Sequence, residues 1–482
     1  MLKDNDLLKS CAYINGNWVA ADSGMRYSVT NPADGSIVGE VPDMGESDAQ
    51  RAIDAAEAAL PEWREKTASV RATILMRWYS LVLEHHEDLA CLMTMEQGKP
   101  LSEARSEVNY GAGFLQWFAE EGKRVYGDVI PTIARDRRIL TIKQPLGVVA
   151  LITPWNFPLA MLTRKAGAAL AAGCTVVAKP AEDTPLTALA LAELAQRAQL
   201  PKGVLNILTT QAPGMIGRVF TRSPTVRKLS FTGSTKVGKQ LMADCAPTVK
   251  RISLELGGNA PFIVFDDADL DAAVAGALAA KYRNSGQTCV CANRFLIQDG
   301  IYDQFVTRFV AEVRAIKVGP GLENSQQGPL INLAALEKVE FLVSDAISKG
   351  AKVLCGGKRH ALGRTFYEPT VLIAVNGEMA CVREEIFGPI APMLRFHTEK
   401  EAIRMANDTS YGLAAYFYAR DIGRIWRVSE ALEYGMVGIN QGLISTEVAP
   451  FGGVKESGFG REGSKYGIDE YLEIKYLCMG GI

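Results

Sequence analysis

Residues 147–158 read GVVALITPWNFP, and they begin the segment 147–245, from which the fold class can be predicted. Between residues 147 and 245, short apolar segments alternate with longer segments of helical periodicity. The predicted strands cover residues 147–152, 175–178, 204–208 and 228–231. The predicted helices cover residues 160–172, 185–198, 215–220 and 237–245. This alternation predicts an α/β fold with a doubly wound parallel sheet.

Polar motifs directly follow three of these strands: TPWN (153–156), KPAE (179–182) and FTGST (231–235). Ligands of doubly wound sheets bind beyond the carboxyl ends of the strands, so we expect the motifs to border one site. In FTGST, Gly233 lets a ligand approach the backbone, and Ser234 offers a hydroxyl and an N–H where a helix begins. A glycine at such a turn is more often a plain turn residue, so this motif alone decides nothing.

After Glu255, the second half of the chain again alternates predicted strands and helices. A strand is predicted at 262–265 and a helix at 270–282, with further elements through 437. We find no close internal repeat and no low-complexity linker. The sequence therefore predicts two interlocked α/β domains.

The stretch NSGQTCVCANR (284–294) carries a candidate nucleophile, Cys289, between small and polar neighbours. Upstream, LELGGN (254–259) places Glu255 between apolar residues and beside glycines, a setting typical of a half-buried general base. Cysteine is also a common core residue, and a glutamate can simply cap or pair. Cys291 is interpreted as a packing residue, with a reversible disulfide to Cys289 under oxidation as the alternative.

Composition excludes several classes of function. The chain has 482 residues, 48% of them hydrophobic and 22% charged, with a net charge of -2, so neither nucleic acid nor an anionic membrane is an expected partner. The uncharged run 144–163 is interrupted by prolines, which favours a strand and loop over a membrane helix. Nine scattered cysteines and no visible secretory signal predict a cytoplasmic protein. The four histidines do not belong to a cluster of metal-ligand residues, so the sequence does not predict a metal site.

Taken together, the motifs resemble the NAD(P)-dependent aldehyde dehydrogenase superfamily, in order and spacing over essentially the whole chain. The motifs already quoted are joined by EEIFGP (384–389) and PFGG (450–453). More narrowly, RNSGQTCVCANR (283–294) and FGREGSKYGIDEYLEIKY (459–476) resemble the succinate-semialdehyde dehydrogenase branch, with glutarate-semialdehyde enzymes as near relatives.

The resemblance implies a mechanism. Cys289 attacks the aldehyde carbon, and the Asn156 amide with the Cys289 N–H stabilises the resulting oxyanion. Hydride transfer to the nicotinamide leaves a thioester, which Glu255 hydrolyses by activating water. Glu462 assists proton exit by the same analogy.

The resemblance also implies a bound dinucleotide. Residues 153–156 and 231–235 border it, Lys179 and Glu182 reach the adenosine ribose, and Glu385 and Phe387 hold the nicotinamide half. A carboxylate at Glu182 accepts hydrogen bonds from a ribose 2′-hydroxyl and repels a 2′-phosphate, so NAD is preferred and NADP remains possible. The cofactor contacts expected are Thr153, Pro154, Trp155, Lys179, Glu182, Gly233, Ser234, Glu385 and Phe387.

A semialdehyde acid needs a cation for its far carboxylate. By resemblance, Arg164 and Arg283 supply it, with Ser445 as a third donor and Phe451 lining the substrate site. The other common role of an arginine is a surface ion pair. One methylene changes binding by only ~1–3 kcal/mol, so glutarate semialdehyde is an alternative substrate.

The resemblance assigns an aldehyde dehydrogenase-like domain plan. Residues 1–125 and 147–255 form a Rossmann-type NAD(P)-binding domain, and residues 256–450 form an α/β catalytic domain. Residues 126–146 and 465–482 form a small β oligomerisation arm, which implies a homodimer or homotetramer. Two alternatives to hydrolytic dehydrogenation are a non-catalytic protein on this fold and an acylating enzyme that passes the thioester to coenzyme A.

Overall fold

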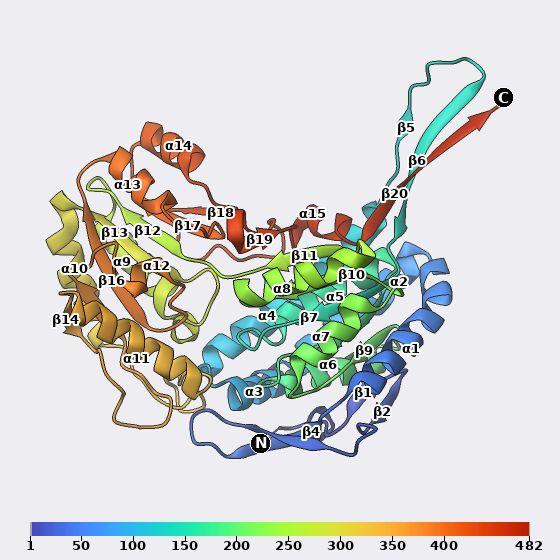
Figure 1. Cartoon of the computed structure of the whole chain (residues 1–482), viewed down its shortest axis with the longest axis horizontal. Helices are drawn as coiled ribbons and strands as arrows, with labels where there is room; N and C mark the ends of the chain where they lie inside the picture. The colour runs from blue at the N-terminus through green and yellow to red at the C-terminus, as the bar shows by residue number, and fades with distance from the viewer. Residues whose placement is uncertain (1, 482) are drawn as a thin grey trace.

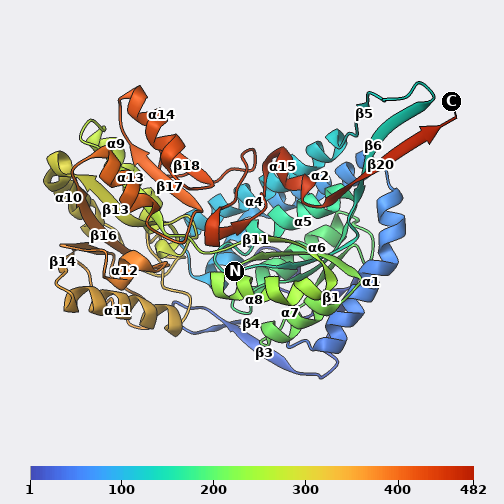
Figure 2. The same ribbon diagram turned by 45° about the horizontal axis from the view of Figure 1, so that its top comes forward.

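The computed structural model describes residues 2–481 (Figure 1). Residues 1 and 482, which belong to the predicted first domain and arm, lie outside the described residues. Two α/β sheets lie beside each other, and a thin β-structure projects from one of them (Figures 1 and 2). The predicted α/β fold class is confirmed.

The first sheet has eight strands in the order β19-β11-β10-β7-β8-β9-β1-β2. Its parallel centre consists of β7 (Val148–Ile152), β8 (Thr175–Lys179), β9 (Leu205–Ile207), β10 (Val226–Thr232) and β11 (Arg251–Glu255). The hairpin of β1 (Ala12–Ile14) and β2 (Asn17–Val19) extends one edge in antiparallel pairing.

Helices cover both faces of this sheet. The connecting helices are α5 (Ala160–Ala172), α6 (Pro185–Arg197), α7 (Pro213–Arg222) and α8 (Thr235–Cys245). The amino-terminal helices are α1 (Glu46–Glu65), α2 (Ala68–Glu84), α3 (His86–Gln97) and α4 (Leu101–Glu121). Helices α2 to α6 share one hydrophobic core, and α1, α7 and α8 share the core on the opposite face.

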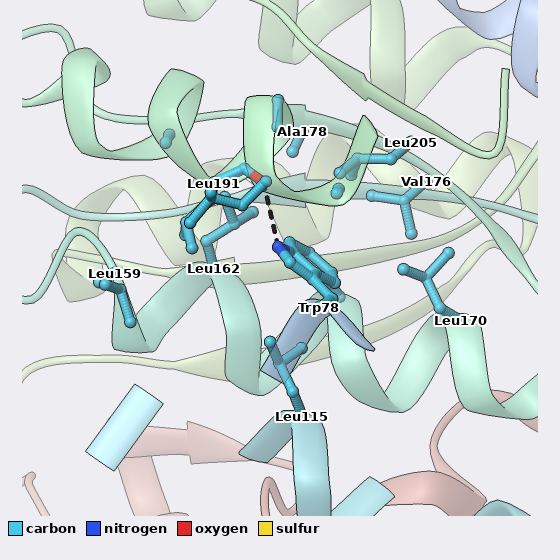
Figure 3. Packing of buried hydrophobic residues seen from close by; sticks show 14 of the residues in the cluster. Trp78, Leu115, Leu159, Leu162, Leu170, Val176, Ala178, Leu191 and Leu205 are labelled. Carbon is cyan, nitrogen blue, oxygen red and sulfur yellow. Dashed lines mark hydrogen bonds between the residues drawn. The ribbon is translucent and has the colours of Figure 1, made fainter. Parts of the chain in front are cut away.

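Trp78 shows how the first core is built (Figure 3). Its ring is 1% exposed and packs among aliphatic side chains of α5, α6 and β8. The indole N–H donates to the carbonyl of Leu191 at 3.1 Å, so the one polar atom of the ring is satisfied inside the core. The helices are thereby fixed against the sheet whose strand ends carry the polar motifs.

The second sheet has seven strands in the order β14-β15-β16-β13-β12-β17-β18. Their bounds are β12 (Ala260–Val264), β13 (Ala292–Gln298), β14 (Lys352–Cys355), β15 (Thr370–Ile373), β16 (Ile390–Phe396), β17 (Ala414–Tyr418) and β18 (Met436–Ile439). All neighbours pair in parallel except β14 with β15. Helices α9 (Leu270–Tyr282) and α10 (Asp299–Arg314) cover one face. The other face is covered by α11 (Leu333–Ser348), α13 (Glu399–Asn407) and α14 (Ile422–Ala431).

The two halves interlock through the carboxyl-terminal segment. After β18, the chain returns to the first sheet, where β19 (Gly458–Phe459) pairs with β11, and α15 (Ser464–Asp469) follows. Strand β20 (Leu472–Gly480) then pairs antiparallel with β6 (Arg137–Pro145), and β5 (Val129–Ile130) completes the projecting sheet (Figure 1). Within residues 2–481, no helix is both long and apolar enough to cross a membrane.

Candidate active site

A cavity of about 320 Å³ lies where loops from both sheets meet. It is lined by strand-end residues of the first sheet and by loops of the second. The predicted site residues that line it are Pro154, Trp155, Asn156, Arg164, Gly233, Ser234, Arg283, Cys289, Glu385, Phe387, Ser445 and Phe451. Thr153, Lys179, Glu182, Glu255, Cys291 and Glu462 are not among the lining residues.

Cys289 is half-buried in the wall of this cavity. Burial raises the pKa of its thiol to about 12; the Arg164 guanidinium lowers that pKa, whereas the Glu385 and Glu255 carboxylates raise it. In the resting geometry the sulfur therefore carries its proton, and nucleophilic attack requires a group or water that removes it.

The turn before Cys289 is strained and tightly held. Asn284 and Ser285 adopt left-handed backbone angles, with φ of 51° and 56°. The Asn284 N–H donates to the Glu103 carboxylate at 2.7 Å, and the Asn284 side chain accepts from Gln97 at 3.0 Å. Helices α3 and α4 thus fix the turn that presents the nucleophile.

Asn156 is also held in place, through hydrogen bonds of its side chain and of its backbone carbonyl. Its Nδ2 donates to the carbonyl of Gln287 at 3.0 Å, and its buried Oδ1 has no hydrogen-bond partner. Its backbone carbonyl accepts from the buried Lys99 ammonium at 2.7 Å. Lys99 forms an ion pair with Glu107, whose other oxygen accepts from the Leu159 N–H at 3.0 Å where α5 begins.

Sequence reasoning missed Lys99, Glu107 and Tyr110. Tyr110 lines the cavity, and its buried hydroxyl has no hydrogen-bond partner. All three lie in or just before α4, which the sequence presents only as an amphipathic helix. No local signal marks them, because their roles depend on contacts with loops more than 45 residues away.

Glu255 lies at the end of β11 and is 2% exposed, with Oε2 lacking a hydrogen-bond partner. Burial raises its pKa well above the usual range, and the neighbouring Glu462 charge raises it further. Glu462 is buried in an ion-paired cluster with Arg164 and Lys165, and the Ser230 hydroxyl donates to it at 3.4 Å. Burial alone would raise the pKa of Glu462, but the two cations hold it below its ordinary value.

The two candidate substrate arginines differ in their surroundings. The Arg164 guanidinium is paired with Glu462 and stacks over the Phe451 ring at 4.3 Å, with Nη1 lacking a hydrogen-bond partner. The Arg283 guanidinium lies over the Phe157 ring at 5.2 Å, and no carboxylate in residues 2–481 lies within ion-pair distance of it. Arg283 is therefore a cavity cation open to an anionic ligand, unlike Arg164, which Glu462 occupies.

The strand-end groups form a groove with the features of a dinucleotide site. Ser234 caps α8 by accepting from the Val237 N–H at 3.4 Å, and a side chain at Gly233 would lie 2.4 Å from the Phe231 ring. Backbone N–H groups at such a helix start bind phosphate well. Across the cavity, the Trp155 and Phe387 rings meet edge to face, with centroids 5.4 Å apart.

Lys179 and Glu182 lie farther along the same strand edge. The Lys179 ammonium forms an ion pair with the Glu182 carboxylate at 3.1 Å, and the Glu182 side chain is 43% exposed. Glu182 lines a second cavity of about 470 Å³ together with Asp183 and Gln211. Lys179 and Glu182, which the KPAE motif predicts as ribose contacts, are thus paired with each other, and the Glu182 carboxylate is accessible.

Cys291 faces away from the cavity. Its sulfur accepts a hydrogen bond from the Lys281 ammonium at 3.3 Å, and all nine cysteines of the chain are free thiols. Residues 2–481 contain no group of three or more His, Cys, Asp or Glu side chains placed to hold a metal ion.

Comparisons with known proteins agree with this geometry. The model of the aldehyde dehydrogenase family matches residues 18–477. The chain is 62% identical to the glutarate-semialdehyde dehydrogenase of Pseudomonas aeruginosa, over all of both chains. It is 60% identical to the succinate-semialdehyde dehydrogenase [NADP(+)] GabD of Escherichia coli, over 99% of each.

The fold comparison gives the same result. A crystal structure of an E. coli NADP-dependent enzyme superposes over all of both chains with a TM-score of 0.99 and 59% identity. The structure of a succinate-semialdehyde dehydrogenase from Burkholderia pseudomallei superposes with a TM-score of 0.98 and 60% identity, over 99% of each chain. The resemblance drawn from the sequence motifs is confirmed, and the chain belongs to the aldehyde dehydrogenase family.

Proposed function

We propose that this aldehyde dehydrogenase oxidises aldehydes that carry an anionic group at the far end, with succinate semialdehyde as the leading substrate. The observation that carries this proposal is that Arg283, a cation without a carboxylate partner among the described residues, lines the same cavity as Cys289. Relatives named for glutarate semialdehyde, succinate semialdehyde and 3-sulfolactaldehyde support this substrate class, because all three aldehydes carry an anionic group at the far end.

In this mechanism, water in the cavity takes the proton of the Cys289 thiol, and the thiolate attacks the aldehyde carbon. The Asn156 Nδ2 and the Cys289 N–H stabilise the oxyanion, and one such donor contributes ~3 kcal/mol. NAD(P), held by Glu385, Phe387 and the loop with Gly233 and Ser234, would supply the hydride acceptor. Glu255 then turns toward the cavity and activates the water that hydrolyses the Cys289 thioester, and Glu462 with Lys165 takes up the released proton.

For the cofactor, we propose that NAD is preferred and NADP is also used. The accessible Glu182 carboxylate supports this preference, because it accepts from a ribose 2′-hydroxyl and repels a 2′-phosphate. The E. coli relative carries NADP(+) in its name, so the ratio of the two cofactors is the decisive measurement.

Glutarate semialdehyde is the second candidate substrate, favoured by the 62% identical relative from P. aeruginosa. A pocket distinguishes one methylene by only ~1–3 kcal/mol, so both semialdehydes should react. Hydrolysis is proposed in preference to transfer to coenzyme A, because Glu255 is present beside the cavity.

We further propose that the projecting sheet joins subunits into a homodimer or homotetramer. Support comes from its exposed apolar side chains, including Val129 (86% exposed), Ile133 (97%) and Ile474 (68%). A cytoplasmic location is supported by the free state of all nine cysteines.

Steady-state kcat/KM tests the proposal directly. It should be measured for the four-carbon and five-carbon semialdehydes and for a neutral aldehyde of similar size, each with NAD and NADP, by following reduced nicotinamide. We expect both semialdehydes to exceed the neutral aldehyde, and Cys289→Ser to abolish turnover. Equal kcat/KM for charged and neutral aldehydes would refute the anionic substrate class.

A further inference from the structure

Lys281, the one lysine of α9, is completely buried beside a thiol. Its side chain is 0% exposed, and among residues 2–481 its Nζ has one hydrogen-bond partner, the sulfur of Cys291 at 3.3 Å. No described carboxylate lies within ion-pair distance of it. A buried lysine normally has a carboxylate or several carbonyl partners, so this pairing needs an explanation.

The Cys291 thiol is held in the same contact. The residue is 3% exposed, and its sulfur lies 3.4 Å from the carbonyl oxygen of Lys281 and 3.6 Å from that of Ala292. Cys289 lines the cavity, whereas Cys291 does not. Among the described residues, the side-chain hydrogen-bond partner of the Cys291 sulfur is the Lys281 nitrogen.

The environment favours an uncharged amine and an uncharged thiol. Burial lowers the pKa of Lys281, and the Cys291 and Cys381 thiols oppose this shift. Burial raises the pKa of Cys291; Lys281 and Arg283 oppose that shift, and Glu385 adds to it. A neutral amine in contact with sulfur is a nucleophile, whereas an ammonium is not.

We propose that Lys281 and Cys291 form a reversible covalent S–N crosslink when the protein is exposed to hydrogen peroxide. In the first step, the Cys291 thiol passes its proton to the Lys281 nitrogen, and the thiolate breaks the peroxide O–O bond to become a sulfenic acid; the leaving hydroxide takes the proton back from Lys281 and forms water. In the second step, the Lys281 nitrogen attacks that sulfur, the S–O bond breaks, and the leaving hydroxide takes a proton from the nitrogen to form water.

A dithiol reverses the crosslink. Two thiol groups of dithiothreitol return the free amine and free thiol and become a disulfide. The crosslink would tie the end of α9 to the residue two positions after the nucleophile. The crosslink does not depend on which aldehyde the enzyme oxidises. It would compete with a Cys289–Cys291 disulfide for the Cys291 sulfur.

Peptide mapping separates these products, because trypsin cleaves after Arg283. A Cys289–Cys291 disulfide stays within residues 284–294, whereas the proposed crosslink joins that peptide to residues 252–283 with no cleavage at Lys281. The folded protein should be treated with peroxide, quenched, alkylated and digested. We expect the joined peptide, lighter by two hydrogen atoms than the sum of its parts, and its loss after dithiothreitol.

Variants identify the two atoms. Cys289→Ser removes the competing disulfide and should increase the joined peptide, and Cys381→Ser, a matched control at another buried thiol, should leave it unchanged. Cys291→Ala and Lys281→Arg should abolish it, the latter because a guanidinium is not a comparable nucleophile. Oxidised wild type and Cys289→Ser that both lack the joined peptide would overturn the proposal, and so would a joined peptide that persists in Lys281→Arg.

Discussion

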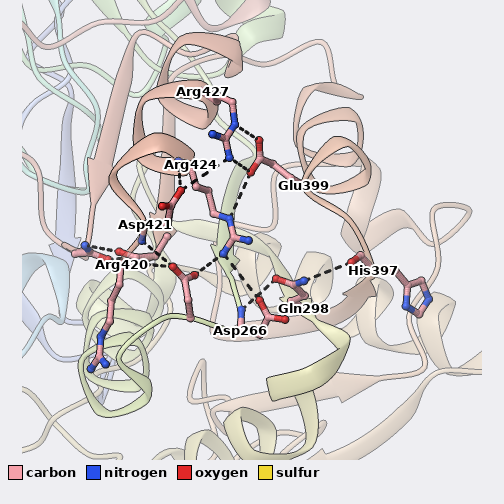
Figure 4. A network of polar contacts seen from close by, with 11 residues as sticks. Asp266, Gln298, His397, Glu399, Arg420, Asp421, Arg424 and Arg427 are labelled. Carbon is pink, nitrogen blue, oxygen red and sulfur yellow. Dashed lines mark hydrogen bonds and ion pairs between the residues drawn. The ribbon is translucent and has the colours of Figure 1, made fainter.

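Two charge networks in this molecule have opposite surroundings. One lies beside the cavity, where Glu462 is paired with Arg164 and Lys165, and the side chains of these residues are 0–5% exposed. The other lies on the outside of the second sheet, where Arg424 and Arg427 both bind Glu399 (Figure 4). There the Arg427 side chain is 59% exposed, and its guanidinium binds the Glu399 carboxylate with two hydrogen bonds of 2.8 and 2.9 Å.

Charge has the larger effect where water cannot reach it. Water and salt screen the outer network, so its many contacts contribute little net stability. The buried network cannot be screened, so each charge there requires its partner and shifts the pKa of its neighbours. Burial raises the pKa of Glu255, whereas the buried Arg164 and Lys165 charges lower the pKa of Glu462.

The largest expected effect comes from breaking the buried network. Glu462→Ala leaves the Arg164 and Lys165 charges buried without an acid, which should lower the free energy of unfolding by about 3–5 kcal/mol. Urea denaturation of the purified protein measures this. Replacing Glu462, Arg164 and Lys165 together by leucine and methionines should recover much of the loss, and a loss in Glu462→Ala below that of Arg427→Ala would contradict the distinction drawn between the networks.

Arg283 is a third case, a cavity cation without a carboxylate partner among the described residues. Arg283→Ala should weaken the binding of succinate semialdehyde by about 1.5–3 kcal/mol, seen as a rise in KM, because a charge-assisted hydrogen bond to the ligand is lost. A neutral aldehyde of similar size should lose much less. Lys338→Ala, at another cavity cation, is the matched control. Equal losses on charged and neutral aldehydes would exclude Arg283 as the anion-binding group.

The pH dependence of stability tests Glu255. The pKa of Glu255 is raised in the folded protein. Above the unfolded pKa of about 4.3, the folded protein therefore holds a proton that the unfolded chain has lost. The free energy of unfolding then falls as the pH rises from that value toward the folded-state pKa. The slope is at most about 1.4 kcal/mol per pH unit for one proton. Glu255→Gln should therefore gain stability relative to wild type as the pH rises above about 5. Parallel curves for the two proteins across that range would show that burial does not shift this carboxyl.

The smallest expected effect is in the outer network. Arg427→Ala should change the free energy of unfolding by about 0–1 kcal/mol, with the difference shrinking as salt is added. Its kcat/KM should equal that of wild type. A salt-independent loss of several kcal/mol would show that the exposed pair behaves like the buried one.

Much of the fold could be predicted because its signals are local. The helices predicted at 160–172 and 270–282 match α5 and α9 in both bounds, since apolar periodicity and flanking glycines or polar caps are readable within one segment. The motifs after β7, β8 and β10 were expected at one sheet edge, and the structure places them there. Strand β19 was not predicted, since its pairing with β11 joins residues about 200 positions apart.

From the sequence alone, the alternation of strands and helices between residues 147 and 245 could be predicted, and Cys289 and Glu255 stood out as candidates, because these follow from residue type and nearest neighbours; Asn156 was added by the family resemblance. Only the tertiary structure decided that Arg164 is occupied by Glu462 whereas Arg283 is open, and that Lys99 holds the Asn156 carbonyl. The physical reason is that a buried charge is defined by its partner. That partner comes from a distant segment, which only the packed chain brings within hydrogen-bond distance.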